Sequence, residues 1–271
     1  MNADTKLRFE FGKNWDEFIR QNFGQDKVDI SKRHMLKFMQ RDNLDGLSFL
    51  DIGCGSGLHS IAALQSGAAA VHGFDYDASS VSATRFVQEK AGNPENWVVQ
   101  QGSVLDDVFI AALPKYDVVY SWGVLHHTGD VWHAIKNAAR CVKPGGIFYI
   151  ALYSADVQKD PTPEFWLRVK QKYVSAGPFT RRMMEAWYVL RFELHYNIFF
   201  LPRLLKRIRE YKESRGMNMF TDIRDWLGGW PMEFVHDADA IVFCEKLGFK
   251  LQNIATGEAN TEFLFIRDQG D

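Results

Sequence analysis

Three glycines at alternate positions follow a short apolar segment and one aspartate near residue 50. The residues are Asp51, Gly53, Gly55 and Gly57, and the stretch 58–64 after them has helical spacing. An apolar run that ends in glycines is typical of a buried strand that turns sharply into a helix. Glycine lets the backbone adopt positive φ and approach a ligand closely. Because the first N–H groups of the helix face this loop, the stretch predicts a nucleotide-like ligand there.

A second acid, Asp75, ends the next apolar stretch, 22 residues after Gly53. An acid about 20 residues beyond a glycine turn, at the tip of the neighbouring strand, can accept hydrogen bonds from the hydroxyls of a ribose. The glycine spacing is G-x-G-x-G, however, and dinucleotide-binding proteins have G-x-G-x-x-G. The spacing therefore disfavours an NAD-dependent oxidoreductase, which is kept as an alternative.

The acid-x-G-x-G-x-G loop resembles the first motif of the class I S-adenosylmethionine (SAM)-dependent methyltransferases. The resemblance covers roughly residues 45–154, including the K-P-G-G sequence at 143–146 that often precedes a strand in this family. It implies that the chain binds SAM and releases S-adenosylhomocysteine. The cofactor contacts that it implies are Asp51, Gly53, Cys54, Gly55, Gly57, Leu58, Asp75, Tyr76, Ser103, Val104, Ser121, Trp122 and Gly123.

Within this set, Ser103 and Val104 match the place that holds the adenine ring in the family, at the tip of the third strand. Many relatives have an acid where Ser103 stands. Ser103 is alternatively the N-cap of a helix expected over 105–113, because a serine hydroxyl readily accepts from the free N–H groups of a first helical turn.

Two adjacent histidines, His126 and His127, follow the strand expected over 115–122. Leu-His-His sequences recur at this place in relatives, beneath the methyl group. An imidazole with a pKa of about 6.5 suits removal of a proton at neutral pH. We expect His126 first, and His127 second, as the base or as a group that orients the substrate. Alternatively, one ring is buried and holds the loop by hydrogen bonds.

Other side chains near the same edge are candidates for substrate contact. Phe11 to Trp15 is either part of a helix that packs on the core or a lid over the cofactor. The substrate-binding candidates are Trp15, Tyr153, Trp230 and Glu233. As the base, Tyr153, Asp156, Glu233 and His236 are weaker candidates than the two histidines. No cluster of residues has metal-ligand spacing, so we expect no metal in the mechanism.

Alternating strands and helices predict an α/β fold, with a doubly wound, mostly parallel, seven-stranded sheet whose last strand is antiparallel. The same spacing predicts helices over 15–23, 32–41 and 78–90 and a strand over 97–101, and the residues 226–233 predict a turn-rich approach to the last helix. Helical stretches at 164–174, 179–200 and 202–215 interrupt the alternation and predict an inserted helical cap. The expected parts are a helical segment or lid (1–46), a SAM-binding Rossmann-like core (47–154), the inserted cap for substrate (155–230), and a C-terminal helix and β-hairpin (231–271).

Composition limits the function further. Of the 271 residues, 46% are apolar, which is enough for a full core, and the net charge of −2 gives no overall basic field for nucleic acid. The three cysteines, Cys54, Cys141 and Cys244, suggest neither a disulfide framework nor a zinc site. No signal peptide or membrane-spanning run is recognisable, so we expect a cytoplasmic protein. The oligomeric state stays open.

The leading hypothesis is a methyltransferase that acts on a small molecule, with oxygen as the favoured acceptor, by in-line displacement without a metal. An RNA or protein methyltransferase is the main alternative, because the stretch 202–215 carries six Lys or Arg residues. That stretch is either a solvated helix face or a patch for an anionic substrate, a polyanion or a lipid surface. No Asn/Asp-Pro-Pro-Tyr motif follows the fourth strand, where Ser121 to Val124 stand. A non-catalytic SAM-binding subunit is a third possibility.

Overall fold

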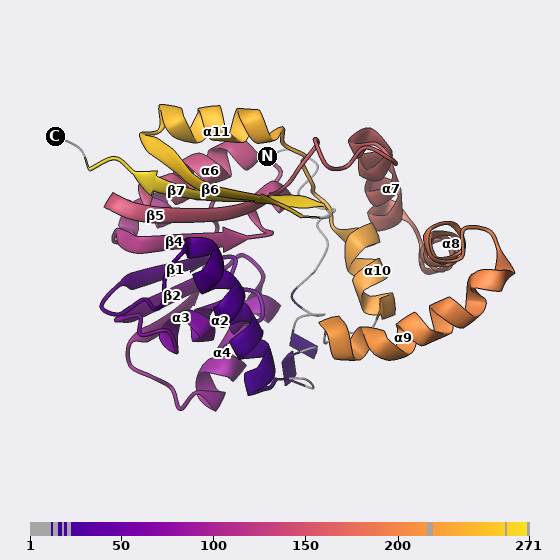
Figure 1. Cartoon of the computed structure of the whole chain (residues 1–271), viewed down its shortest axis with the longest axis horizontal. Helices are drawn as coiled ribbons and strands as arrows, with labels where there is room; N and C mark the ends of the chain where they lie inside the picture. Colours follow the sequence, from indigo (N-terminus) through magenta and orange to yellow (C-terminus); the bar gives the residue numbers. More distant parts are fainter. Residues whose placement is uncertain are drawn as a thin grey trace.

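The fold is built on one seven-stranded sheet flanked by helices (Figure 1). The computed structural model describes residues 12, 16–17, 19–20, 23–215, 219–257 and 259–269. Along the sheet the strands have the order β3-β2-β1-β4-β5-β7-β6. They are β1 (Ser48–Ile52), β2 (Ala70–Asp75), β3 (Trp97–Gln101), β4 (Tyr116–Trp122), β5 (Val142–Tyr153), β6 (Phe249–Thr256) and β7 (Asn260–Arg267).

Strands β1 to β5 are parallel, and β7 lies antiparallel between β5 and β6. This confirms the predicted mostly parallel sheet with an antiparallel last strand. The chain first moves outward from β1 to β3 and then returns to place β4 on the other side of β1. Ligands of such sheets bind outside the carboxyl ends of the strands, at the point where the order reverses. That point is the end of β1 and β4.

The two faces of the sheet carry separate apolar cores. Helices α2, α3 and α4 cover one face, where Val28, Ile61 and Val87 are buried. Helices α5, α6 and α11 cover the other, where Ile135 and Cys244 are buried (Figure 1). The bounds are α2 (Gln25–Met39), α3 (Leu58–Leu64), α4 (Ala78–Lys90), α5 (Asp107–Ala112), α6 (Val131–Arg140) and α11 (Asp237–Lys246). Helices on both faces explain why the central strands are apolar throughout.

Between β5 and α11 the chain leaves the sheet and forms a group of helices, here called the cap helices. They have an apolar cluster of their own around Trp166, Leu204 and Leu227. In Figure 1, α10 lies between the sheet and α8. None of the helices that the structure describes is both long and apolar enough to cross a membrane. The elements are α7 (Pro163–Ser175), α8 (Pro178–Tyr188), the π-helical η3 (Val189–Glu193), the 3-10 helix η4 (Ile198–Phe200), α9 (Leu201–Arg215) and α10 (Met219–Gly228).

The continuous helix predicted over 179–200 is wrong. Helix α8 ends at Tyr188, and after the π-helical turn His195 and Tyr196 have φ values of 48° and 58°. Two consecutive residues in the left-handed region cannot continue a right-handed helix. The apolar and aromatic spacing of this stretch resembled that of a helix, but the chain turns here to bring α9 back along the cap.

Two predicted turns also differ. The K-P-G-G residues 143–146 lie within β5, where the pairing with β4 is interrupted between Val142 and Ile147. A φ of 71° at Gly145 accompanies this bulge, so the motif bends a strand instead of preceding it. The segment 226–233, predicted as a turn-rich approach to a helix, begins inside the last turn of α10.

The first helical elements differ from expectation in their bounds. Helices were expected over 15–23 and 32–41, whereas α2 already begins at Gln25. Of the predicted lid, only Gly12 is described, and Trp15 lies outside the described residues. The N–H of Gly12 donates to Oδ2 of Asp77 at 3.0 Å, so this segment contacts the start of α4 beside the carboxyl end of β2.

Candidate functional site

The loop between β1 and α3 is shaped by three glycines with positive φ: 75° at Gly53, 53° at Gly55 and 78° at Gly57. A Cβ at Gly53 would lie 2.4 Å from a methyl of Val124, and one at Gly57 would lie 3.0 Å from Cα of Thr84. At Gly55 the nearest atom would be a carbonyl oxygen 3.8 Å away. Packing of the protein itself therefore requires two of the glycines, whereas the third faces open space that a ligand can fill.

Strand β2 ends at Asp75, and its carboxylate contacts the glycine loop. The N–H of Gly55 donates to Oδ2 at 3.1 Å, and the N–H of Asp77 donates to Oδ1 at 2.9 Å. The predicted convergence of the glycine loop and the acid of the neighbouring strand is therefore present. A carboxylate offers about four acceptor positions, so two backbone bonds are compatible with hydroxyl ligands on the same group.

Three predicted cofactor contacts have buried side chains. Asp51 accepts a hydrogen bond from the Ser60 hydroxyl at 2.6 Å, and burial raises the pKa of Asp51 to about 7. The Thr84 hydroxyl donates to Sγ of Cys54 at 3.3 Å, and the Ser121 hydroxyl donates to the last carbonyl of β1 at 3.0 Å. These side chains hold the strand ends together. Because these side chains are buried, we expect their contacts with a cofactor to be made by backbone atoms.

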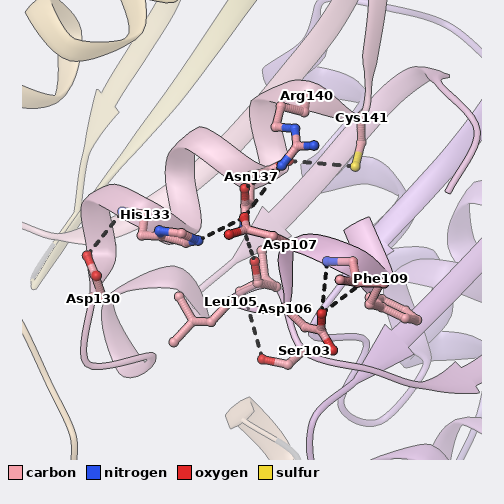
Figure 2. Close-up of polar contacts among 12 residues, drawn as sticks. Ser103, Leu105, Asp106, Asp107, Phe109, Asp130, His133, Asn137, Arg140 and Cys141 are labelled. Atoms are coloured by element: carbon pink, nitrogen blue, oxygen red, sulfur yellow. Dashed lines mark hydrogen bonds and ion pairs between the residues drawn. The ribbon is translucent and has the colours of Figure 1, made fainter. Parts of the chain in front are cut away.

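The loop after β3 is held by hydrogen bonds within the loop and to α6 (Figure 2). The hydroxyl of Ser103 accepts from the N–H of Leu105 at 3.2 Å, and the carbonyl of Val104 accepts from the Asn137 side chain of α6 at 2.9 Å. Val104 is buried, while Ser103 is partly exposed. The position predicted to hold an adenine is thus a fixed turn.

Ser103 is not the N-cap of the following helix, as the alternative interpretation held. Helix α5 begins at Asp107, and Asp106 caps it by accepting two N–H groups of its first turn at 3.0 and 3.1 Å. Figure 2 also shows Asp107 facing α6, where His133 Nε2 and Arg140 Nη1 lie 3.1 and 3.5 Å from its Oδ1. Asp106, which directly precedes α5, is therefore the N-cap residue in place of Ser103.

The remaining predicted cofactor contacts lie around the loop. Tyr76 follows β2 and is 54% exposed. Trp122 is the last residue of β4 and is 40% exposed. Gly123 has a φ of 75°, and a Cβ there would meet nothing within 4 Å. Leu58 begins α3 and packs on the core. Two exposed aromatic rings and a second open glycine therefore lie at the carboxyl ends of β2 and β4.

His126, the first predicted base, is 1% exposed. Its Nδ1 accepts from the N–H of Tyr153 at 3.3 Å, so the neutral ring carries its proton on Nε2. This Nε2 is buried and has no hydrogen-bond partner in the part of the chain that the structure describes. Burial, followed by the charges of His127 and Lys170, holds the pKa of His126 well below its usual range. This geometry favours an orienting or loop-holding role over that of a base.

His127 has the opposite arrangement. Its Nδ1 lies 2.8 Å from the carbonyl oxygen of Pro231. A carbonyl only accepts, so Nδ1 carries the proton, and in the neutral ring Nε2 carries the lone pair. The side chain is half-buried. The two histidines therefore differ in which ring nitrogen carries the proton.

Tyr153 connects the two histidines with the cap helices. Its ring centroid lies 4.3 Å from that of His126 and 5.7 Å from that of His127. Trp226 of α10 meets it nearly edge-on, with centroids 5.7 Å apart. Phe234 lies on another side at 6.0 Å. This predicted substrate residue therefore lies where the carboxyl end of β5 meets the cap.

Other substrate candidates have structural partners. Glu233 accepts from the N–H of Val131 at 2.9 Å, at the start of α6, and burial raises its pKa. His236 lies 2.9 Å from Asp156, and this pair is exposed at the start of α11. Trp230 is half-buried, and its Nε1 has no hydrogen-bond partner among the described residues. Of these, only Trp230 presents a buried donor.

The sequence analysis missed Lys170 of α7, which is fully buried. Its Nζ donates to the carbonyl of Trp226 and lies 4.1 Å from the centroid of that indole ring. Burial lowers its pKa to about 7, against the charge of Asp225. A signal was present, because Lys170 lies four residues after Trp166 and four before Val174, on the buried side of its helix.

A doubly wound sheet that carries a glycine loop and an acid at the next strand tip defines a nucleotide-binding α/β protein. The chain belongs to the methyltransferase-domain family, whose model matches residues 19–232. Among solved structures, a similar fold is found in the magnesium protoporphyrin IX methyltransferase of Synechocystis PCC 6803 with bound SAH. The TM-score is 0.55 at 16% identity, covering 97% of this chain and 99% of that one.

Two curated relatives extend the comparison. The ubiquinone biosynthesis O-methyltransferase of Methylobacterium nodulans is 32% identical over 162 residues, which cover 56% of this chain and 63% of the relative. The tRNA U34 carboxymethyltransferase of Methylococcus capsulatus is 32% identical over 123 residues, 44% of this chain and 37% of the relative. The matched segments thus span less than two thirds of either relative.

Proposed function

We propose that this chain is a SAM-dependent methyltransferase that transfers a methyl group to a small-molecule acceptor, with oxygen as the favoured atom. The observation that carries the proposal is the contact of Gly55 with Asp75 beside the open side of that glycine. A side chain at Gly55 would enter this open space, which the cofactor would occupy. Membership of the methyltransferase-domain family supports the same reading.

The residues around this contact fit an adenosyl group. Asp75 would accept the ribose hydroxyls, the loop 53–57 would lie along the amino-acid part, and the fixed turn at Ser103 and Val104 would meet the adenine. When bound, SAM supplies a methyl on a sulfonium, whose sulfur leaves as a neutral thioether. The chain therefore has to align the acceptor, exclude water and remove one proton. Alignment alone is worth roughly 7–11 kcal/mol in favourable cases.

We propose that His127 removes the proton of the acceptor. Its Nε2 would take the proton of an acceptor hydroxyl while the Pro231 carbonyl keeps accepting from Nδ1–H, which stabilises the imidazolium that forms. His126, whose Nδ1 accepts from the N–H of Tyr153, would hold the loop that carries His127 in place. A positioned base contributes about 10²–10⁴-fold to the rate.

RNA is a second candidate substrate. Arg203, Lys206 and Arg209 of α9 are exposed, and one relative is a tRNA-modifying enzyme. Binding of RNA through these cations would weaken steeply as salt is raised. The small-molecule proposal is preferred because Tyr153, which contacts both histidines, packs against Trp226 of α10, whereas these cations lie on α9.

The test begins with calorimetric titration of the chain with S-adenosylhomocysteine and, separately, with NADH. Binding of the first and not the second is expected. A panel of phenols, carboxylic acids and amines is then screened for release of S-adenosylhomocysteine from SAM. If NADH binds and S-adenosylhomocysteine does not, methyl transfer is ruled out.

A further inference from the structure

The outer part of the cap exposes an unusual number of apolar side chains. Phe199 is 88% exposed, Phe179 is 77% exposed and Tyr196 is 63% exposed. Figure 1 shows α8 and the adjoining end of α9 on the side of the cap away from the sheet. Exposed apolar residues that gather on neighbouring elements often mark an interaction surface. We call the exposed residues of 178–209 the outer cap surface.

The exposed apolar residues follow helical spacing. On α8, Phe179 and Met183 are one turn apart, and Leu190 follows in η3, seven residues after Met183, at 48% exposure. On α9, Leu201 and Leu205 are also one turn apart. Each helix therefore has a second apolar stripe toward solvent, in addition to the residues that fill the cluster around Trp166.

Basic residues accompany these stripes. The segment 178–209 contains seven Lys or Arg and two Glu, a net charge of +5 in a chain whose total is −2. Arg182 lies beside Met183, and Arg203, Lys206 and Arg209 are exposed on α9. Arg209 continues the line of Leu201 and Leu205 by one more turn. The outer cap surface is thus both apolar and strongly cationic.

This combination selects one kind of partner. A helix with exposed apolar side chains bordered by Lys and Arg lies in the interface of an anionic bilayer, with the apolar groups inserted and the cations at the headgroups. A second copy of the chain would bring one +5 surface against another. RNA would use the cations and stack on the phenylalanines, but it leaves Met183, Leu190, Leu201 and Leu205 without a role.

We propose that the outer cap surface docks the protein on anionic lipid bilayers. This proposal is independent of the methyl-transfer chemistry, because none of its residues belongs to the Gly55–Asp75 site. Docking would hold the cap helices, and the histidines at their base, close to acceptors that partition into a bilayer.

The test is co-sedimentation of the full chain with vesicles of phosphatidylcholine alone or mixed with phosphatidylglycerol. Binding is expected only to the mixed vesicles, and it should weaken with salt. The variant Phe199→Ser/Leu205→Ser should lose about tenfold or more in partitioning. Val108→Ser is the matched control, because Val108 is 81% exposed on α5, outside the cap.

A charge-reversal pair separates the two contributions. Arg203→Glu/Lys206→Glu should abolish the preference for phosphatidylglycerol, whereas Lys115→Glu, an exposed lysine near β4, should not. Circular dichroism and S-adenosylhomocysteine binding show whether each variant is folded. Failure of the wild-type chain to bind mixed vesicles would overturn the proposal. Undiminished vesicle binding of the Phe199→Ser/Leu205→Ser variant would also overturn it. So would the finding that this variant loses binding to RNA, or loses a dimer, while its vesicle binding is unchanged.

Discussion

The backbone N–H of Gly55 donates to the carboxylate of Asp75 at 3.1 Å. This bond joins the end of β1 to the end of β2 and fixes the acid against the loop before any ligand arrives. The second oxygen of the carboxylate accepts from the N–H of Asp77, the N-cap residue of α4. The orientation of Asp75 is therefore set by the backbone, and little reorganisation is needed for hydroxyl ligands to bind.

Gly55→Ala is expected to abolish binding of S-adenosylhomocysteine, because its Cβ enters the open side of the loop. Positive φ also costs an alanine about 1 kcal/mol of folding stability. Gly92→Ala controls for that strain, since Gly92 has a φ of 85° and open space but lies in a distant turn. Calorimetry and urea denaturation measure the two effects. Equal loss of affinity in both variants would mean that strain, and not the ligand's space, matters at Gly55.

Asp75→Ala should weaken S-adenosylhomocysteine binding by about 1–3 kcal/mol, because it removes charged acceptors of hydrogen bonds. The matched control is Glu95→Ala, which removes an exposed acid before β3. Titration calorimetry gives both affinities. An unchanged dissociation constant for the Asp75 variant would refute the ribose assignment.

His127→Gln should lower turnover at least about tenfold and leave S-adenosylhomocysteine affinity nearly intact, since a glutamine cannot take a proton. His133→Gln, at a partly exposed histidine of α6, is the control and should keep full turnover. Release of S-adenosylhomocysteine at saturating acceptor is the readout. Wild-type turnover in the His127 variant would remove this ring from the mechanism.

Lys170→Met should stabilise the protein at pH 7, because a buried ammonium with few partners is replaced by an apolar chain of similar length. The pKa of Lys170 in the folded protein is about 7, below its ordinary 10.5. Between these values the unfolded chain binds a proton that the folded protein lacks, so the stability of the wild type rises with pH. The variant lacks this rise.

The advantage of Lys170→Met over the wild type should therefore shrink from pH 7 to pH 10. The decrease in this stability advantage between pH 7 and pH 10.5 is at most about 5 kcal/mol. This bound is the difference between the pKa values 10.5 and 7, multiplied by 1.36 kcal/mol for each pH unit. Urea denaturation at several pH values measures it. Lys115→Met, at an exposed lysine, should show no such trend. A constant difference for Lys170 would show that its ammonium is not titrating in this range.

Local patterns determined most of the core sheet. The helices at 58–64 and 78–90 and the strand at 97–101 have the predicted bounds, because glycines, prolines and apolar spacing mark their ends within the chain itself. The parallel order followed from the alternation of strands and helices. The cap was harder to predict, because its aromatic spacing suits a long helix. The helix ends near His195 and Tyr196, which have positive φ, and neither is a glycine that would have indicated a helix end in the sequence.

The residues that gather at the edge of the sheet could be read from the chain alone, because strand ends are encoded locally and a parallel sheet brings them together. The chemistry of each group depends on the folded arrangement. Adjacent histidines look alike in a sequence, but Tyr153 N–H occupies Nδ1 of His126 while the Pro231 carbonyl receives Nδ1–H of His127. Those partners come from β5 and the segment before α11, far along the chain. Burial and protonation depend on such distant neighbours, which no local pattern contains.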